Sequence, residues 1–192
     1  MILVVIGGGA AGVHAALTCR RLRPSDSIIL IDAESEAGYY RPLLPLFMIG
    51  RTGEDKLFFW NPADDPLLTV YLGTAVDRLD RQNRRVYLAN GKKVQYDRLI
   101  LSPGGYPIMP PVCVNDSCRG IFPVRSLTAA RKVREWIPEH HKIVVIGGGL
   151  VGVKTALFLV ASGLDVTLVE KESHLLPNAL STEASRPVEE HL

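Results

Sequence analysis

The chain has 192 residues, 47% of them hydrophobic, and a formal net charge of +2. This is ample apolar material for one or two folded domains. The 22 Lys and Arg are interspersed with 20 Asp and Glu. This pattern excludes the concentrated basic surface that is typical of nucleic-acid-binding proteins. Met1 leads directly into an apolar run, and Lys154 and Asp165 interrupt the apolar stretch 143–169. We therefore expect neither a signal peptide nor a membrane span.

The first 32 residues predict a strand–helix–strand unit. Apolar residues 2–6 and 27–31 indicate strands, and residues 10–22 indicate a helix. A G-x-G-x-x-G motif lies where the first strand meets the helix, and its glycines are Gly7, Gly9 and Gly12. The second strand leads into Asp32, which lies 20 residues after Gly12.

Each position of this motif has a physical role in binding a dinucleotide. The first glycine permits a tight turn, the second lets the backbone approach a pyrophosphate, and the third lets helix and strand pack closely. The helix offers unpaired N–H groups and the positive end of its dipole to the phosphates. A carboxylate about 20 residues further on reaches the ribose hydroxyls. The pattern therefore predicts a dinucleotide site, whereas the alternative is a glycine-rich turn in an ordinary crossover.

The middle of the chain predicts irregular structure followed by strands. Residues 39–50 are expected to form a loop and a short helix, since Pro42 and Pro45 limit regular structure. Three runs predict short strands: 68–76, 84–96 and 98–102. Asn90-Gly91, between alternating apolar residues, predicts a hairpin turn.

The strand–glycine–helix pattern occurs again from residue 143. A proline-rich linker and a helix over 126–137, with Ser126 as its N-cap, come before it. The repeated motif contains Gly147, Gly149 and Gly152. Its helix is expected over 150–162, with Gly163 at the C-terminal cap. The following strand leads into Glu170, 18 residues after Gly152.

These elements predict an α/β fold of the three-layer ββα type. Two Rossmann-like βαβ dinucleotide-binding units are expected, with an antiparallel β-meander inserted between them. The predicted boundaries are 1–107 for the first domain, 108–125 for a linker and 126–192 for the start of a second domain.

Three further segments carry a family resemblance. Residues 96–104, YDRLILSPG, match a YDxLVLATG strand, and residues 120–127, GIFPVRSL, match a GVFxLRT segment. Tyr40-Arg41-Pro42 resembles part of a YxRPxLS stretch. With the two glycine motifs, the order resembles the pyridine nucleotide–disulfide oxidoreductase superfamily. It is most similar to rubredoxin and ferredoxin reductases and to the flavin part of NADH-dependent nitrite reductases.

The resemblance implies an FAD-dependent NAD(P)H oxidoreductase of which this chain is the N-terminal part. By the family pattern, residues 1–107 would be the first segment of a discontinuous FAD-binding domain. The second domain is expected to be truncated, after one crossover and part of a further helix. FAD is expected in the first domain, from its place in the family order and from Asp32. In the second domain NAD(H) is expected in preference to NADP(H), because the Glu170 carboxylate would repel the 2′-phosphate of NADP(H). A hydride would pass to the flavin, and electrons would then reach an acceptor such as a small redox protein. The oligomeric state is left open.

The motifs and the resemblance together assign the cofactor-binding residues. The first site is assigned Gly7, Gly9, Ala10, Ala11, Gly12, Asp32, Ala33, Arg41, Pro42, Ala75, Val76, Ser102, Pro103 and Gly104. The second site is assigned Gly147, Gly149, Leu150, Val151, Gly152, Glu170 and Lys171. Neither a metal site nor an indispensable catalytic side chain is expected.

Three positions depart from the family pattern. Leu46 and Lys154 stand where ferredoxin reductases have a lysine and a glutamate that pair beside the flavin and nicotinamide. Lys154 either alters nicotinamide docking, contacts a phosphate or an acidic acceptor, or keeps its ammonium in solvent, and we favour the last interpretation. Pro103 replaces a threonine. Leu46, Lys154 and the short length of the chain favour one alternative, a non-catalytic module that binds an adenine dinucleotide.

The cysteines and histidines indicate little chemistry of their own. Residues 39–50 contain no cysteine, so a thiol relay beside the flavin is not expected. Cys113 and Cys118 are interpreted as loop thiols in preference to a disulfide or metal pair, and Cys19 as a small core residue. This cysteine pattern favours a reduced, cytoplasmic setting. His14 is expected to pack within the fold in preference to facing a flavin.

Overall fold

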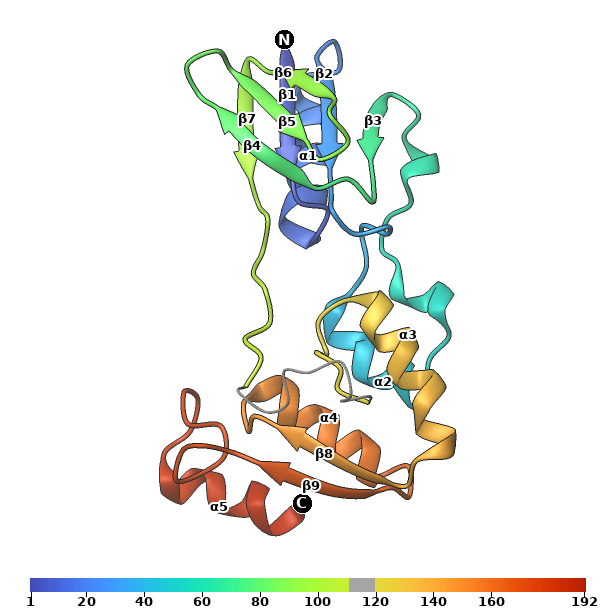
Figure 1. Ribbon diagram of the computed structural model, residues 1–192, viewed down its shortest axis with the longest axis vertical. Coiled ribbons are helices and arrows are strands. Elements are labelled where there is room, and N and C mark those ends of the chain that lie inside the picture. Colours follow the sequence, from blue (N-terminus) through green and yellow to red (C-terminus); the bar gives the residue numbers. More distant parts are fainter. Residues whose placement is uncertain (111–119) are drawn as a thin grey trace. The chain divides into compact units, whose positions relative to one another are not determined.

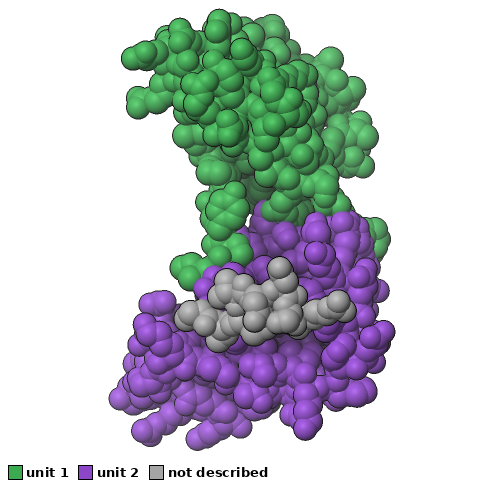
Figure 2. Space-filling view, viewed as in Figure 1, with its two compact units in different colours: residues 1–40, 55–108 green, residues 41–54, 109–192 purple. Residues whose placement is uncertain are grey.

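The computed structural model describes residues 1–110 and 120–192. This part of the chain divides into two compact units, which are coloured separately in Figure 2. Unit 1 contains residues 1–40 and 55–108, and unit 2 contains residues 41–54 and 109–192. Each unit contains one of the two crossovers. None of the described helices has the length and apolar character that spanning a membrane requires.

Unit 1 is built on a parallel sheet with the strand order β3-β2-β1-β7, and Figure 1 shows the four strands side by side. The strands are β1 (Ile2–Ile6), β2 (Ser27–Ile31), β3 (Leu68–Tyr71) and β7 (Arg98–Leu101). Helix α1 (Ala10–Leu22) connects β1 to β2. These bounds confirm the first predicted crossover.

The two faces of β1 pack against different layers, because alternate side chains of a strand point to opposite sides. One buried cluster contains Leu3, Val5, Val13 and Ala16, and so joins β1 to α1. The other contains Val4, Ile31, Val86 and Val94, and so joins the parallel sheet to the inserted strands. Helix, parallel sheet and antiparallel sheet are therefore stacked in three layers, as predicted.

The antiparallel layer is a meander with the order β4-β5-β6. Its strands are β4 (Val76–Asp80), β5 (Arg85–Leu88) and β6 (Lys93–Gln95). The predicted hairpin at Asn90-Gly91 is present, with Gly91 at φ 84° and Asn90 Oδ1 accepting from Lys92 N at 3.0 Å. The prediction of one strand over 68–76 is wrong. Gly73 has φ 61° and interrupts it, so that residues 68–71 form β3 and only Val76 of the predicted run belongs to β4.

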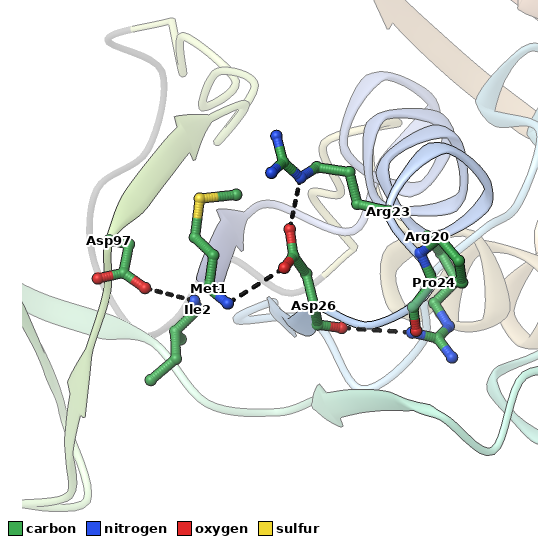
Figure 3. Close-up of polar contacts among 7 residues, drawn as sticks. All are labelled: Met1, Ile2, Arg20, Arg23, Pro24, Asp26 and Asp97. Atoms are coloured by element: carbon green, nitrogen blue, oxygen red, sulfur yellow. Dashed lines mark hydrogen bonds and ion pairs between the residues drawn. The ribbon is translucent and has the colours of Figure 1, made fainter.

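Hydrogen bonds and ion pairs fasten the start of β1 to its neighbours (Figure 3). The Met1 ammonium lies 3.1 Å from Asp26 Oδ1, and Arg23 Nε lies 2.7 Å from Asp26 Oδ2. The hydrogen bond from the terminal ammonium is the main cause that lowers the pKa of the Asp26 carboxyl. The Ile2 N–H donates to Asp97 Oδ2 at 2.6 Å. These contacts lie at the end of β1 that is remote from the glycine turn.

Unit 2 contains the second crossover, in which β8 (Lys142–Ile146) and β9 (Asp165–Val169) pair in parallel. Helix α4 (Leu150–Val160) joins them, so it ends two residues before the predicted limit, and Gly163 follows at φ 82°. The other helices are α2 (Leu44–Met48), α3 (Leu127–Trp136) and α5 (Thr182–His191). Ser126 caps α3 as predicted, its side chain accepting from Ala129 N at 3.2 Å.

Residues 41–54, which we call the inserted segment, belong to unit 2 although elements of unit 1 precede and follow them. The segment contains a short 3₁₀ turn and then α2, in agreement with the loop and short helix predicted there. Leu44, Phe47 and Met48 of α2 are buried. The apolar face of this short helix is therefore part of the core of unit 2.

Candidate dinucleotide-binding turns

The turn between β1 and α1 depends on glycine at two positions for different reasons. Gly7 has φ 109°, which disfavours any side chain, and a Cβ there would also overlap the Ser102 carbonyl. Gly12 lies within α1, and a Cβ on it would overlap the Gly7 carbonyl oxygen. The first strand can therefore turn directly into a helix that lies against it, which is the geometry that the motif predicts.

Gly9, by contrast, faces open space. It is the N-cap of α1, with φ −72° and ψ −178°, and no described atom lies within 4 Å of a Cβ built on it. No side chain caps this helix, whereas Ser126 caps α3 and Ser181 caps α5. The N–H groups of the first turn of α1 are thus available to an anion, which the helix dipole also favours.

Asp32 lies beside this turn. Its Oδ2 accepts from Gly8 N at 2.5 Å, and its Oδ1 accepts from Glu34 N at 3.0 Å. An ionised carboxylate offers about four lone-pair positions, so both oxygens can accept further hydrogen bonds. The acidic residue predicted to hold a ribose is therefore placed at the glycine turn, and it supports the turn at the same time.

The turn between β8 and α4, the second glycine turn, has almost the same geometry. Gly147 has φ 106°, and Gly149 is the N-cap of α4, with φ −76° and ψ −177° and again no described atom within 4 Å of a Cβ. A Cβ on Gly152 would overlap the Gly147 carbonyl oxygen. The Gly148 N–H donates to Glu170 Oε2 at 2.5 Å, as the Gly8 N–H does to Asp32.

Glu170 is held as a carboxylate by backbone donors. Besides Gly148, the N–H groups of Lys171 and Glu172 donate to its Oε1 at 2.7 and 2.9 Å. These hydrogen bonds, that of Glu172 foremost, lower the pKa of the Glu170 carboxyl. The Lys171 ammonium is turned to solvent and lies 3.8 Å from Glu172 Oε1. Glu170 therefore presents a negative charge at the second turn.

The other residues predicted for the first site are divided between the two units. Ser102, Pro103 and Gly104 directly follow β7, and the Ser102 hydroxyl donates to the Ile6 carbonyl at 3.0 Å. Unit 1 also contains Ala10, Ala11, Ala33, Ala75 and Val76. Arg41 and Pro42, however, lie in the inserted segment of unit 2. A site shared by these two residues and the first turn therefore stays a prediction.

Lys154 has a partner that the sequence did not indicate. Its Nζ donates to the Pro42 carbonyl at 3.0 Å and lies 5.6 Å from the centre of the Phe158 ring. Leu150 and Val151, which precede it in the first turn of α4, are exposed. Lys154 therefore connects the helix of the second turn to the inserted segment.

Gly8 and Gly148 are candidate site positions that the G-x-G-x-x-G pattern does not mark. A Cβ on Gly8 would lie 2.5 Å from Asp32 Oδ2, and one on Gly148 would lie 2.6 Å from Leu175 Cδ2. Each also donates the hydrogen bond that holds the carboxylate. The repeated triplet Gly-Gly-Gly, present in both copies, is the signal that could have identified them.

The remaining candidates are placed within the fold or lie outside the described residues. The His14 ring stacks on Phe59, with 5.2 Å between ring centres and 4° between planes. Cys19 is half-buried and packs against the core of unit 1. Cys113 and Cys118 lie outside the described residues. Within residues 1–110 and 120–192, no group of three or more potential ligands is arranged to hold a metal.

Two crossovers, each with an open glycine turn and a carboxylate held beside it, define a dinucleotide-binding α/β protein. The family model described as pyridine nucleotide-disulphide oxidoreductase matches residues 1–192. The chain belongs to this family.

Relatives and solved structures agree with this assignment. The chain is 29% identical to an NADH oxidase of Methanocaldococcus jannaschii, over 100% of the chain and 45% of the relative. It is 32% identical to rhodocoxin reductase of Rhodococcus erythropolis, over 95% of the chain and 43% of the relative. A NAD-dependent persulfide reductase from A. fulgidus has a similar structure, with a TM-score of 0.91 and 32% identity over 100% of this chain and 38% of that one. The chain thus spans about half the length of the curated relatives that it matches.

Proposed function

We propose that the chain forms the cofactor-binding part of a flavoprotein reductase that passes a hydride from NADH to FAD and then electrons to an acceptor. One observation carries the proposal. The same turn, with the same open glycine and the same carboxylate contact, occurs twice in one chain. Two such sites suit a reaction between two dinucleotides.

FAD is assigned to the first turn and NADH to the second. Membership of the family and the order of its segments support this assignment. The charge on Glu170 supports NADH over NADPH, since a carboxylate accepts from a free ribose hydroxyl and repels a 2′-phosphate.

In this proposal the protein positions its cofactors and leaves the redox chemistry to them. FAD and NADH, when bound, supply the hydride transfer. The N–H groups at Gly9 and Gly149 hold the diphosphates, while Asp32 and Glu170 hold the sugars. No side chain is proposed as acid or base for the first step, because the cofactors would supply the redox chemistry.

The acceptor is proposed to be a small electron-transfer protein. Several relatives have names that indicate such an acceptor, among them a ferredoxin–NAD(P)(+) reductase of a Sphingomonas species and the nitric oxide reductase FlRd-NAD(+) reductase of Vibrio vulnificus. One similar structure, 25% identical with a TM-score of 0.88, is a covalent complex of putidaredoxin reductase with putidaredoxin. Oxygen, nitrite and quinones are the alternative electron acceptors, and an activity assay would compare them with a small electron-transfer protein.

A visible spectrum tests the proposal most directly. The purified protein is expected to show the flavin absorption bands, which bleach on anaerobic addition of NADH and return when an acceptor is supplied. The alternative function is a non-catalytic module that binds an adenine dinucleotide. A colourless protein that binds ADP-ribose and takes up no added FAD would support this alternative and overturn our proposal.

A further inference from the structure

Residues along the whole inserted segment form contacts with the rest of unit 2. At its start, Arg41 Nη1 donates to the Arg125 carbonyl at 2.6 Å and the Pro42 carbonyl accepts from Lys154 Nζ at 3.0 Å. In its middle, the Arg134 guanidinium lies 4.8 Å from the centre of the Phe47 ring. The segment therefore has partners on both α3 and α4.

The end of the segment is held as firmly. Arg51 Nη2 donates to the Ala161 carbonyl at 2.8 Å. Arg131 makes two hydrogen bonds to the Glu54 carboxylate, at 2.6 and 3.1 Å. Because α2 is also buried, removal of one of these contacts is expected to leave the fold of the segment intact.

Two of these contacts join the segment to α4, the helix that begins at the second glycine turn. Lys154 and Ala161 are seven residues apart, which is about 10 Å along a helix. Lys154 lies only two residues after Gly152, so its contact is the one nearest to the turn. The contacts of Arg41 and Glu54, by contrast, go to Arg125 and Arg131, in or just before α3.

We propose that Lys154 is a positioning residue that couples dinucleotide binding at the second turn to the order of the inserted segment. The inference rests on the proposed function, in which that turn binds a dinucleotide. A ligand on the N–H groups of the first turn of α4 restrains the residues that carry Lys154. The segment bonded to the Lys154 ammonium is then restrained too, and the coupling needs no change in mean structure.

Hydrogen exchange of the protein with and without ADP-ribose tests this inference. ADP-ribose carries the adenosine diphosphate part of NADH and lacks the nicotinamide ring. In the unaltered protein, saturating ADP-ribose is expected to slow exchange over residues 147–154 and also over residues 44–51. Exchange over 44–51 is expected to slow by at least about threefold. The net free energy of one hydrogen bond is large enough to produce a threefold change in the exchange rate.

Variants of Lys154 separate coupling from binding. Lys154→Met is expected to keep the slowing over 147–154 and to lose it over 44–51, because Met cannot donate to the Pro42 carbonyl. Lys154→Arg, which can donate, is expected to restore it. Lys132→Met serves as a matched control, since Lys132 is exposed on α3. This variant is expected to behave as the unaltered protein.

Two results would overturn the inference. One is equal slowing over 44–51 in the unaltered protein and in Lys154→Met. The other is slowing confined to 147–154 in the unaltered protein. If ADP-ribose slows exchange nowhere in 147–154, the second turn binds no dinucleotide, and the proposed function fails together with the coupling.

Discussion

At the scale of single residues, the glycines of one motif differ in what a side chain would meet. Gly12 has no room for a methyl group, whereas Gly9 faces open space and has an extended backbone that any residue can adopt. Close packing thus requires glycine at position 12, whereas we propose that the open space at Gly9 serves cofactor binding. Substitutions can therefore separate the two.

We expect Gly9→Asp and Gly149→Asp to keep the fold and to lose cofactor binding. Asp is a preferred N-cap, so the unfolding free energy should change by less than about 0.5 kcal/mol. The new carboxylate would occupy the place of a diphosphate and repel it, weakening binding by at least about tenfold. Urea denaturation and titration with FAD or ADP-ribose measure the two effects.

Gly12→Ala is expected to show the opposite behaviour. Its methyl group would overlap the Gly7 carbonyl oxygen, so α1 must move away from β1. Overpacking of this kind costs about 1–3 kcal/mol of unfolding free energy, measurable by urea denaturation. A Gly12→Ala protein as stable as the unaltered one would show that the turn is less closely packed than described.

The charge on Glu170 is expected to decide between NADH and NADPH. Glu170→Gln keeps the size of the side chain and removes the charge that opposes a 2′-phosphate. The ratio of kcat/KM for NADH to that for NADPH should fall by at least about tenfold. Asp165→Asn, at the start of β9, is a control that should leave the ratio unchanged. An unaltered protein that uses both cofactors equally would contradict this role.

At the scale of elements, β1 and β8, the first strands of the two crossovers, show what a local pattern can predict. LVVI and IVVI have almost the same letters, and both form the predicted strand. Val4 and Val5 are fully buried between β2 and β7, whereas Val144 is 62% exposed in a sheet that pairs β8 with β9 alone within the described residues. Strand formation is thus local, but burial depends on neighbours that the strand sequence does not specify.

The ion pair between Glu54 and Arg131 is expected to contribute modestly to stability. Both side chains are more than one-third exposed, so Glu54→Gln should lower the unfolding free energy by only about 0.5–1 kcal/mol at neutral pH. The Arg131 hydrogen bond lowers the pKa of Glu54 from 4.5. The contribution is therefore complete above pH 4.5 and is lost as the pH falls through the lowered pKa.

Urea denaturation at several pH values measures this difference. Glu135→Gln, an exposed position on the same helix as Arg131, is the control and should have no effect at any pH. A difference between Glu54→Gln and the unaltered protein that persists in acid would show that the pair acts through packing and not through charge.

At the scale of the whole molecule, the order of elements and the three layers of unit 1 could be predicted from sequence. Periodicity, glycine spacing and turn residues are local signals, and they placed the elements of this unit correctly except over 68–76, where Gly73 divides one predicted strand. The placement of the inserted segment could not be predicted. Glu54 pairs with a residue 77 positions away and Pro42 with one 112 positions away, and no local pattern records such partners.

Separate protection of the two turns is expected when the cofactors are added one at a time. FAD should slow hydrogen exchange over residues 7–12, and ADP-ribose should slow it over residues 147–152. At 100 times its dissociation constant, each ligand should stabilise the unit that binds it by about 2.7 kcal/mol. Protection of the first turn by ADP-ribose and of the second by FAD would reverse our assignment of cofactors.

Asp32 and Glu170 accept hydrogen bonds from their own turns before any ligand arrives. In our proposal these carboxylates also hold the sugars of the cofactors, so that selection for cofactor recognition and selection for a correctly folded chain act on the same atoms. In a mutational scan that scores cellular abundance as well as turnover, substitutions at these two positions should lower both scores. Aspartate at Gly9 or Gly149 should lower turnover alone.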